Sequence, residues 1–338
     1  MCKKLTTVLL KKTAKDILDN SQEVLFTPQK LKDLNTITEN KRIFLSNLKS
    51  PGKLDYKRYV LSPLRYAGGK SLAVGLIVER IPTNIKRIIS PFFCGGSVEI
   101  ACANELGLEV IGYDIFDILM HYWNVQLNNQ DELYKRLLNF APNRNTFKEV
   151  KERLKIHWTT NNKLEYYDLA AYFYFNHNTS YGPHFLGWPS SVYLQEIRYK
   201  KMIEKVRDFR ADKIKVGCET FEDVIPNFNN DFLYCDPPYY LDGDSKTFVG
   251  MYPHRNFPIY HNNFNHEKLR DLLFNHKGGF ILSYNDCSTI REWYKDFNII
   301  APSWQYTFSQ GDTRIGINRL KNNEGTYIKK SHELLIWK

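Results

Sequence analysis

The residues best suited to chemistry lie in the stretch 232–240, which reads FLYCDPPYY. Its four leading residues predict a short buried strand that ends at Asp236, and open α/β sheets bind ligands at the carboxyl ends of their strands. Pro237 and Pro238 lack an N–H, so the turn is stiff and its carbonyl groups can face a ligand. Tyr239 adds a ring that can stack. Together these groups suit a flat ring that carries an exocyclic amine.

Such an amine is a poor nucleophile because its lone pair is delocalised into the ring. The Asp236 carboxylate and the Pro237 carbonyl could each accept one N–H and aim the lone pair at an electrophile, which is catalysis by orientation and charge stabilisation. Tyr239 would hold a base that has left the duplex stack. Two simpler interpretations stay open. Residues 237–240 also match the PPxY peptides that WW domains bind, and the turn can be purely structural.

Composition excludes several classes of protein. The chain has 338 residues, of which 43% are hydrophobic and 25% charged, and these are ordinary globular values for one large domain or two. It has no apolar run of about 18 residues, so we expect no membrane span, and no signal peptide either. Six scattered cysteines without a CxxC pair predict reduced thiols in an intracellular protein. The histidines lack partners at metal-ligand spacing, so we expect no metal site.

The charge balance is basic. Lysine and arginine number 47 against 37 acidic residues, a net charge of +10. Excess positive charge suits a polyanion, because each phosphate contact releases counterions. Aromatic residues make up 14% of the chain, which suits nucleic acid as well as an ordinary core.

Two further segments predict the elements that would position the turn. A strand at 87–90 enters the loop PFFCGGS at 91–97, and a helix follows, which is the first unit of a Rossmann-like sheet. The next strand, 109–113, ends in Asp114, about 20 residues on, where an acid suits ribose hydroxyls. A helix N-cap is the structural alternative for this acid. The GxGxxG pattern is missing, so NAD is not favoured.

The segment GGKS at 68–71 resembles part of a phosphate-binding P-loop. That motif needs a glycine five residues before its Gly-Lys-Ser, and this position holds Leu64. We therefore reject nucleoside triphosphate binding. The glycine pair still lets the backbone approach a ligand closely, and Lys70 can offer a cation.

Three regions follow from these patterns. Residues 1–58 form a basic N-terminal extension that is either solvated or in contact with DNA. Residues 59–119 and 216–338 hold the strand signals and predict the catalytic domain, while 120–215 predict helices and form a candidate target-recognition domain. A basic helical stretch ends that domain and is either a solvated face or a set of DNA-backbone contacts. Its cations are Arg198, Lys200, Lys201, Lys205, Arg207 and Arg210.

Four motifs, in the order in which they occur along the chain, resemble those of one family. RYAGGK at 65–70 is similar to the N-terminal motif of the Dam-like, D12-class DNA adenine-N6 methyltransferases of the alpha motif order. PFFCGGS resembles their glycine loop, Asp114 their ribose acid and DPPY at 236–239 their catalytic motif. The resemblance runs from about residue 62 to the C-terminus.

The resemblance implies a class I methyltransferase fold, which is a Rossmann-like α/β fold with a mostly parallel sheet and an inserted helical recognition domain. It implies methyl transfer from S-adenosylmethionine to adenine N6 in double-stranded DNA, with the target adenine flipped out. The setting would be restriction-modification beside a cognate restriction endonuclease, or an orphan methylase, in either case intracellular and associated with nucleic acid. Implied catalytic residues are Asp236, Pro237 and Tyr239. Implied cofactor-binding residues are Tyr66, Gly68, Gly69, Lys70, Phe92, Gly95, Gly96, Asp114, Phe221 and Asp236.

Several positions depart from the family pattern. Ser90 replaces an acid before the glycine loop, Cys94 replaces the loop's first glycine, and Phe116 replaces a polar residue; all three would weaken cofactor binding. His177 and Tyr181 replace a common arginine and asparagine, so altered base reading is expected and GATC is not assumed as the target. Two alternatives remain: methylation of another exocyclic amine, in cytosine N4 or RNA adenine, and a non-catalytic DNA-binding relative.

Overall fold

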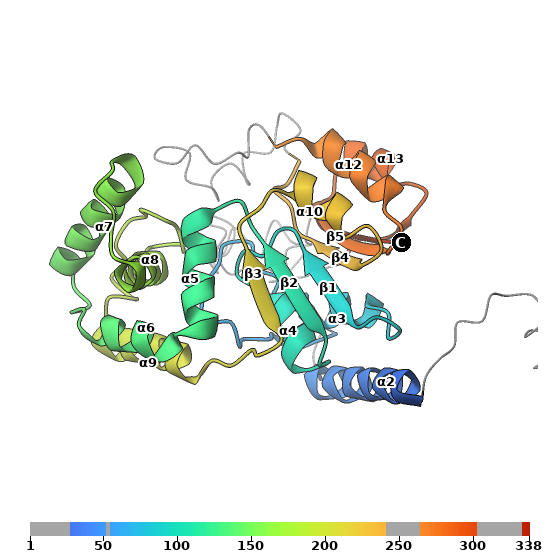
Figure 1. Ribbon diagram of the computed structural model, residues 1–338, viewed down its shortest axis with the longest axis horizontal. Helices are drawn as coiled ribbons and strands as arrows, with labels where there is room; N and C mark the ends of the chain where they lie inside the picture. Colours follow the sequence, from blue (N-terminus) through green and yellow to red (C-terminus); the bar gives the residue numbers. More distant parts are fainter. Residues whose placement is uncertain (1–27, 52–54, 241–263, 303–332) are drawn as a thin grey trace, which may run out of the picture.

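A mixed α/β sheet forms the centre of the protein. The computed structural model describes residues 28–51, 55–240, 264–302 and 333–338 (Figure 1). Seven strands lie in the order β3-β2-β1-β4-β5-β7-β6. Their bounds are β1 (Arg87–Ser90), β2 (Glu109–Tyr113), β3 (Ile214–Gly217), β4 (Phe232–Cys235), β5 (Phe280–Asn285), β6 (Asn298–Ile300) and β7 (Glu333–Trp337). The first five pair in parallel and β7 runs antiparallel to both neighbours. The mostly parallel sheet predicted from the sequence is thus confirmed.

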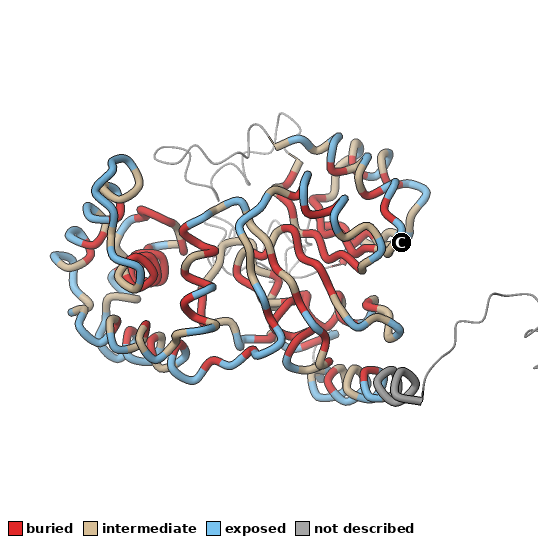
Figure 2. Tube along the Cα trace, in the orientation of Figure 1, coloured by how far each residue is buried: buried red, intermediate tan, exposed pale blue. Residues whose placement is uncertain are grey.

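Helices cover both faces of the sheet. Successive side chains of a strand point to opposite sides, so each strand contributes to a core on either face. In β4, Phe232 and Tyr234 join one core cluster and Leu233 and Cys235 join the other. On the first face lie α3 (Val74–Arg80) and α4 (Ser97–Asn104). On the second face lie α10 (Phe221–Asn227), α12 (His266–Asn275) and α13 (Ser288–Trp293). Figure 2 shows buried residues running along the strands between these layers.

A group of helices lies beside the β3 edge of the sheet (Figure 1). Its members are α5 (Asp117–Asn128), α6 (Gln130–Leu138), α7 (Arg144–Thr159), α8 (Tyr166–Thr179) and α9 (Glu196–Asp208). The middle helix is α8, which packs on α5, α6 and α7 and is buried along most of its length. The α5 helix contacts both β3 and α8, so it joins the helical group to the sheet.

Part of the N-terminal extension packs on the sheet domain. The α2 helix (Pro28–Leu48) starts at a proline, whose fixed φ and missing N–H suit the first position of a helix. Phe44 is buried edge-on against Tyr59, with ring centroids 5.6 Å apart. The Lys41 ammonium donates hydrogen bonds to the carbonyl groups of Glu79 and Ile81 at the end of α3. Residues 1–27 lie outside the described part of the chain. No described helix is both long and apolar enough to cross a membrane.

Gly112 of β2 lets the glycine loop pack onto the sheet. A Cβ at this position would lie 2.0 Å from a ring carbon of Phe93, a loop residue that is buried edge-on against Trp123. We predict that Gly112→Ala lowers the free energy of unfolding by about 1–3 kcal/mol, because the ring has no room to move. Urea unfolding measures this. The control is Glu109→Ala, at an exposed position of the same strand, which should change stability by no more than about 0.5 kcal/mol. Equal stability of the two variants would contradict the prediction.

Candidate active site

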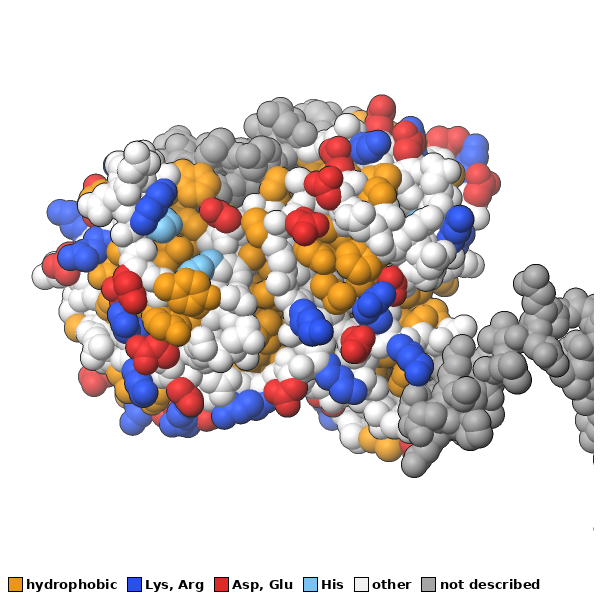
Figure 3. Space-filling view, in the orientation of Figure 1, with side chains coloured by type: hydrophobic (Ala, Val, Ile, Leu, Met, Phe, Trp, Pro, Cys, Tyr) orange, Lys and Arg blue, Asp and Glu red, His pale blue; other side chains and the backbone are white. Residues whose placement is uncertain are grey.

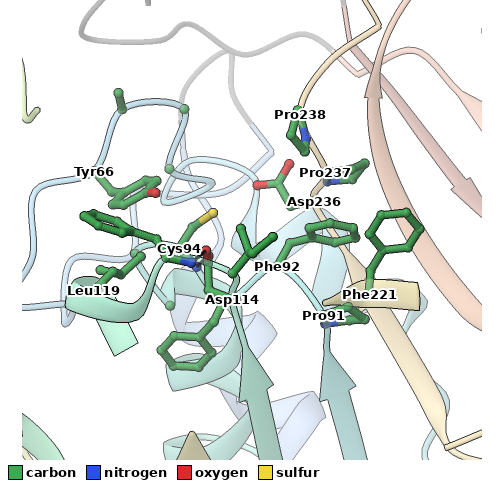
Figure 4. A pocket seen from close by; sticks show the side chains of 18 of the residues that line it. Tyr66, Pro91, Phe92, Cys94, Asp114, Leu119, Phe221, Asp236, Pro237 and Pro238 are labelled. Carbon is green, nitrogen blue, oxygen red and sulfur yellow. Dashed lines mark hydrogen bonds between the residues drawn. The ribbon is translucent and has the colours of Figure 1, made fainter. Parts of the chain in front are cut away.

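The loops after β1, β2 and β4 surround a cavity of about 310 Å³. The chain leaves β1 toward β2 on one side, whereas β4 leads to β5 on the other, so the cavity lies at the topological switch point where α/β sheets bind ligands. Figure 4 shows the side chains that converge there. Every site residue predicted from the sequence lines it: Tyr66, Gly68, Gly69, Lys70, Phe92, Gly95, Gly96, Asp114, Phe221, Asp236, Pro237 and Tyr239.

The glycine loop keeps its sharp turn although Cys94 replaces a glycine. Cys94 adopts a φ of 48° and Gly96 a φ of 65°, both in the left-handed region. The backbone N–H of Cys94 donates to the Asp114 carboxylate at 3.1 Å, and Trp123 Nε1 donates to the Cys94 carbonyl at 2.9 Å. These bonds hold a conformation that a cysteine adopts less readily than glycine.

Asp114 braces this loop and also lines the cavity. Its second oxygen accepts the N–H of Phe116 at 3.1 Å. Burial raises the pKa of the Asp114 carboxyl, and the two backbone donors oppose that rise. The N-cap of α5 is Phe116, so Asp114 is not the helix N-cap.

Three aromatic rings form one wall of the cavity. Phe92 lies 5.7 Å from Phe221 and 5.8 Å from Phe264, and the last two lie 4.9 Å apart, centroid to centroid. Figure 4 shows Phe92 and Phe221 side by side. Sequence reasoning missed Phe264, because it follows a long polar stretch with no pattern. Such a wall suits a flat heterocycle.

An ion pair joins the predicted catalytic acid to the N-terminal motif. Lys70 Nζ lies 2.7 and 2.8 Å from the two carboxylate oxygens of Asp236, and it also donates to the Gly68 carbonyl at 3.1 Å. Burial alone would lower the pKa of Lys70, but Asp236 and Glu333 raise it above its ordinary value. Burial raises the pKa of Asp236, and Lys70 opposes this. The ring of Tyr239 lies 5.2 Å from the same ammonium.

Two buried glutamates near this pair were missed as site residues. Glu99, in the first turn of α4, lines the cavity and accepts a hydrogen bond from Ser90 Oγ at 2.6 Å. A carboxylate therefore lies beside Ser90, where the family has an acid on the strand itself. Burial raises the pKa of Glu99 to about 8, with Ser90 opposing. Burial likewise raises the pKa of Glu333, at the start of β7, to about 8, with Lys70 opposing. The sequence signal for both is an acid among apolar residues.

His177 and Tyr181, which depart from the family pattern, lie in different surroundings. His177 lines the cavity, stacks on Tyr66 at 5.7 Å and contacts the Arg65 carbonyl through Nε2 at 2.9 Å. Burial lowers the pKa of His177 to about 3, so the ring is neutral at physiological pH. Tyr181 is exposed and does not line the cavity. Within the described ranges, no cluster of three or more His, Cys, Asp or Glu side chains could hold a metal ion.

Comparison with known proteins agrees with this geometry. The family model for D12 class N6 adenine-specific DNA methyltransferase matches residues 66–308. The chain is 26% identical over 322 residues to Type II methyltransferase M.FokI of Planomicrobium okeanokoites, covering 87% of this chain and 47% of that protein. It is 24% identical over 300 residues to modification methylase StsI of Streptococcus sanguinis, covering 83% and 43%. The chain thus spans less than half the length of these relatives.

Removing the ammonium of the ion pair should strongly destabilise the fold. We predict that Lys70→Met lowers the free energy of unfolding by about 3–5 kcal/mol, because it leaves Asp236 buried without its cation. The double variant Lys70→Met/Asp236→Asn should recover part of that loss. Urea unfolding of the wild type, Lys70→Met, Asp236→Asn and the double variant measures both effects. Additive losses in the double variant would show that the two side chains are not coupled.

The two buried glutamates should make stability depend on pH. A carboxyl group whose folded pKa is raised from 4.5 to about 8 stabilises the fold below pH 4.5, and this contribution is lost as the pH rises through 8. We therefore predict that wild-type stability declines from pH 5 to 8. The variant Glu99→Gln/Glu333→Gln should decline by at least about 2 kcal/mol less. Urea unfolding across this range is the measurement. Glu109→Gln, at an exposed position, is the control, and parallel curves for both variants would refute the assignment.

Proposed function

Because the chain belongs to the D12 class of N6 adenine-specific DNA methyltransferases, we propose that it methylates adenine N6 in double-stranded DNA, with S-adenosylmethionine as methyl donor. The observation that carries the proposal is the meeting of two separate motifs at one cavity. The turn 236–239 and the glycine loop 91–97 both border it, and a cation from the N-terminal motif is paired with the catalytic acid.

The cavity fits this cofactor. Asp114 would bind the ribose hydroxyls, and the wall of Phe92, Phe221 and Phe264 would hold the adenine ring. Buried carboxylates, among them Glu99 and Asp236, would stabilise the positive charges of the donor. When bound, S-adenosylmethionine supplies an electrophilic methyl group on a sulfonium. The left-handed turn at Cys94 and the carboxylate beside Ser90 support a working pocket over a decayed one.

Asp236 and Pro237 would orient the target amine. Lys70 occupies one side of the Asp236 carboxylate, but such a group has about four lone-pair sites and can still accept an N–H. The Pro237 carbonyl would accept the second N–H, which turns the nitrogen lone pair toward the methyl donor. Because burial raises the pKa of Asp236, this carboxylate also holds a proton more readily than an exposed one. It could therefore take up the proton that the methylated amine releases.

The helical group α5–α9 would read the DNA, with Tyr239 stacking on the flipped adenine. The names of the relatives, a type II methyltransferase and a modification methylase, support a restriction-modification role beside a cognate endonuclease. Such a role would place the protein inside the cell, on DNA.

Nucleoside analysis tests the reaction directly. DNA and RNA are each incubated with the protein and S-adenosylmethionine, digested to nucleosides and analysed by mass spectrometry. We expect N6-methyladenine in DNA alone. N4-methylcytosine, or methyladenine in RNA, would assign the cavity to another exocyclic amine. No methylated nucleoside, together with no heat of cofactor binding, would favour a non-catalytic DNA-binding protein.

Loss of the catalytic carboxylate should abolish transfer. We predict that Asp236→Ala lowers the rate of methyl transfer at least about 100-fold, because the amine loses one of its two acceptors. DNA affinity should change little. The matched control is Asp231→Ala, which also removes an aspartate from an ion pair, at 2.8 Å from Arg87, but lies at the opposite end of β4. Transfer of radiolabelled methyl measures both variants. A wild-type rate in folded Asp236→Ala would reject the catalytic assignment.

A further inference from the structure

A second cavity, of about 480 Å³, lies between α9 and the segment 58–72. Among the described residues, its wall includes five cationic side chains and no carboxylate; the cations are Arg58, Arg65, Arg198, Lys201 and Lys205. It adjoins the first cavity, with which it shares Tyr66, Gly68, Gly69 and Ser97. On the face of the molecule in Figure 3, by contrast, positive and negative side chains are interspersed. The unmixed charge of this cavity therefore sets it apart.

The three cations from α9 form a row. Arg198, Lys201 and Lys205 stand at helical spacings of three and four residues, so they share one helix face. At 1.5 Å per residue the row is about 10 Å long. All three side chains are exposed, and none makes an ion pair with a described carboxylate. On the same helix, Arg207 is instead paired with Asp208 at 2.7 Å.

The opposite wall holds its cations in place. The Arg65 guanidinium lies 3.3 Å from the centre of the Tyr193 ring and donates to the carbonyl of Asn178 at 2.5 Å. Burial lowers the pKa of Arg65 to about 10, which leaves it cationic at neutral pH. Arg58 donates to Ser71 Oγ at 3.3 Å. These contacts present fixed positive charge to the cavity, which favours a ligand with fixed negative charge.

The rings of this cavity already have neighbours, which favours phosphate over a nucleobase as the ligand. Tyr59 is buried edge-on against Phe44, and Tyr66 stacks on His177. The third ring, Tyr193, faces the Arg65 guanidinium.

We propose that this basic cavity binds consecutive phosphates of one DNA strand beside the extruded nucleotide, an inference that rests on the proposed function. Phosphates along one strand of a duplex are spaced by about 3.4 Å of helix axis, so the row on α9 matches about three of them. The thin shared wall would bring the strand close to the methyl-transfer cavity. A free oligophosphate offers the same chemistry, and the test separates the two sources.

The test compares two triple variants with equal loss of charge. Arg198→Gln/Lys201→Gln/Lys205→Gln removes the row on α9. Lys268→Gln/Lys277→Gln/Lys295→Gln removes three exposed lysines on and near α12 and α13, which lie far from α9 in Figure 1. Fluorescence anisotropy with a labelled duplex of mixed sequence measures DNA affinity of the full chain from about 50 to 200 mM salt. For the α9 variant we expect about 10-fold weaker binding and a salt slope smaller by about 2 to 3. The control should change affinity less than twofold.

Three outcomes would overturn the proposal. The first is an unchanged salt slope in the α9 variant, and the second is an equal loss of DNA affinity in the control variant. The third is an α9 variant that keeps its DNA affinity but no longer binds inorganic tripolyphosphate, as measured by calorimetry. The last would assign the cavity to a free oligophosphate. If the α9 variant does not fold, Lys201→Glu carries the same test, with a slope smaller by at least about 1. DNA binding is measured without methyl transfer. If the wild type does not methylate DNA, the proposed function is refuted. If the α9 variant still shows the expected smaller salt slope, this inference stands.

Discussion

The buried ion pair between Lys70 and Asp236 is the contact on which the rest of the site depends. It joins residues 166 positions apart and ties the N-terminal motif to the turn after β4. Burying two charges is expensive, and a well-packed apolar pair in their place is often no less stable. The ion pair is therefore better explained by its positioning of the Asp236 carboxylate than by a contribution to the stability of the fold. It fixes one carboxylate in the wall of a cavity, where Lys70 opposes the rise in pKa that burial imposes on Asp236.

The sheet makes this contact possible. Parallel strands with both faces buried deliver their carboxyl ends to one edge, and the change of direction between β1 and β4 opens a gap there. The glycine loop and the proline turn follow those two strands directly, so the ends of the strands fix the position of both at the cavity. Asn285, at the end of β5, adds a third anchor by donating to the Tyr240 carbonyl at 2.7 Å.

Sequence patterns predicted the parts of this arrangement that are local. The strands at 87–90, 109–113 and 232–235 have the predicted bounds because short apolar runs before loops allow little else. The glycine loop, Asp114 and the turn at 236–239 meet because they follow those strands, whereas the motif at 65–70 lies before β1 and reaches the site through the Lys70–Asp236 pair. Glu99, Glu333 and Phe264 were missed because their roles come from tertiary packing that brings distant segments together. The strand β6 has only three residues and gains its place by pairing with β7, which no local signal reports.

The two cavities carry opposite charge on either side of a thin wall. Among the described lining residues of the first, acidic side chains outnumber the single ammonium of Lys70, and burial raises the pKa of one of them, Glu99, to about 8. In the second, the part of the wall that the structure describes holds five cations and no carboxylate. Gly95 lets Tyr66, which lines both cavities, pack closely on the glycine loop, because a Cβ at this glycine would lie 2.6 Å from Cβ of Tyr66. A cationic methyl donor and an anionic strand could thus lie close together without either meeting charge of its own sign.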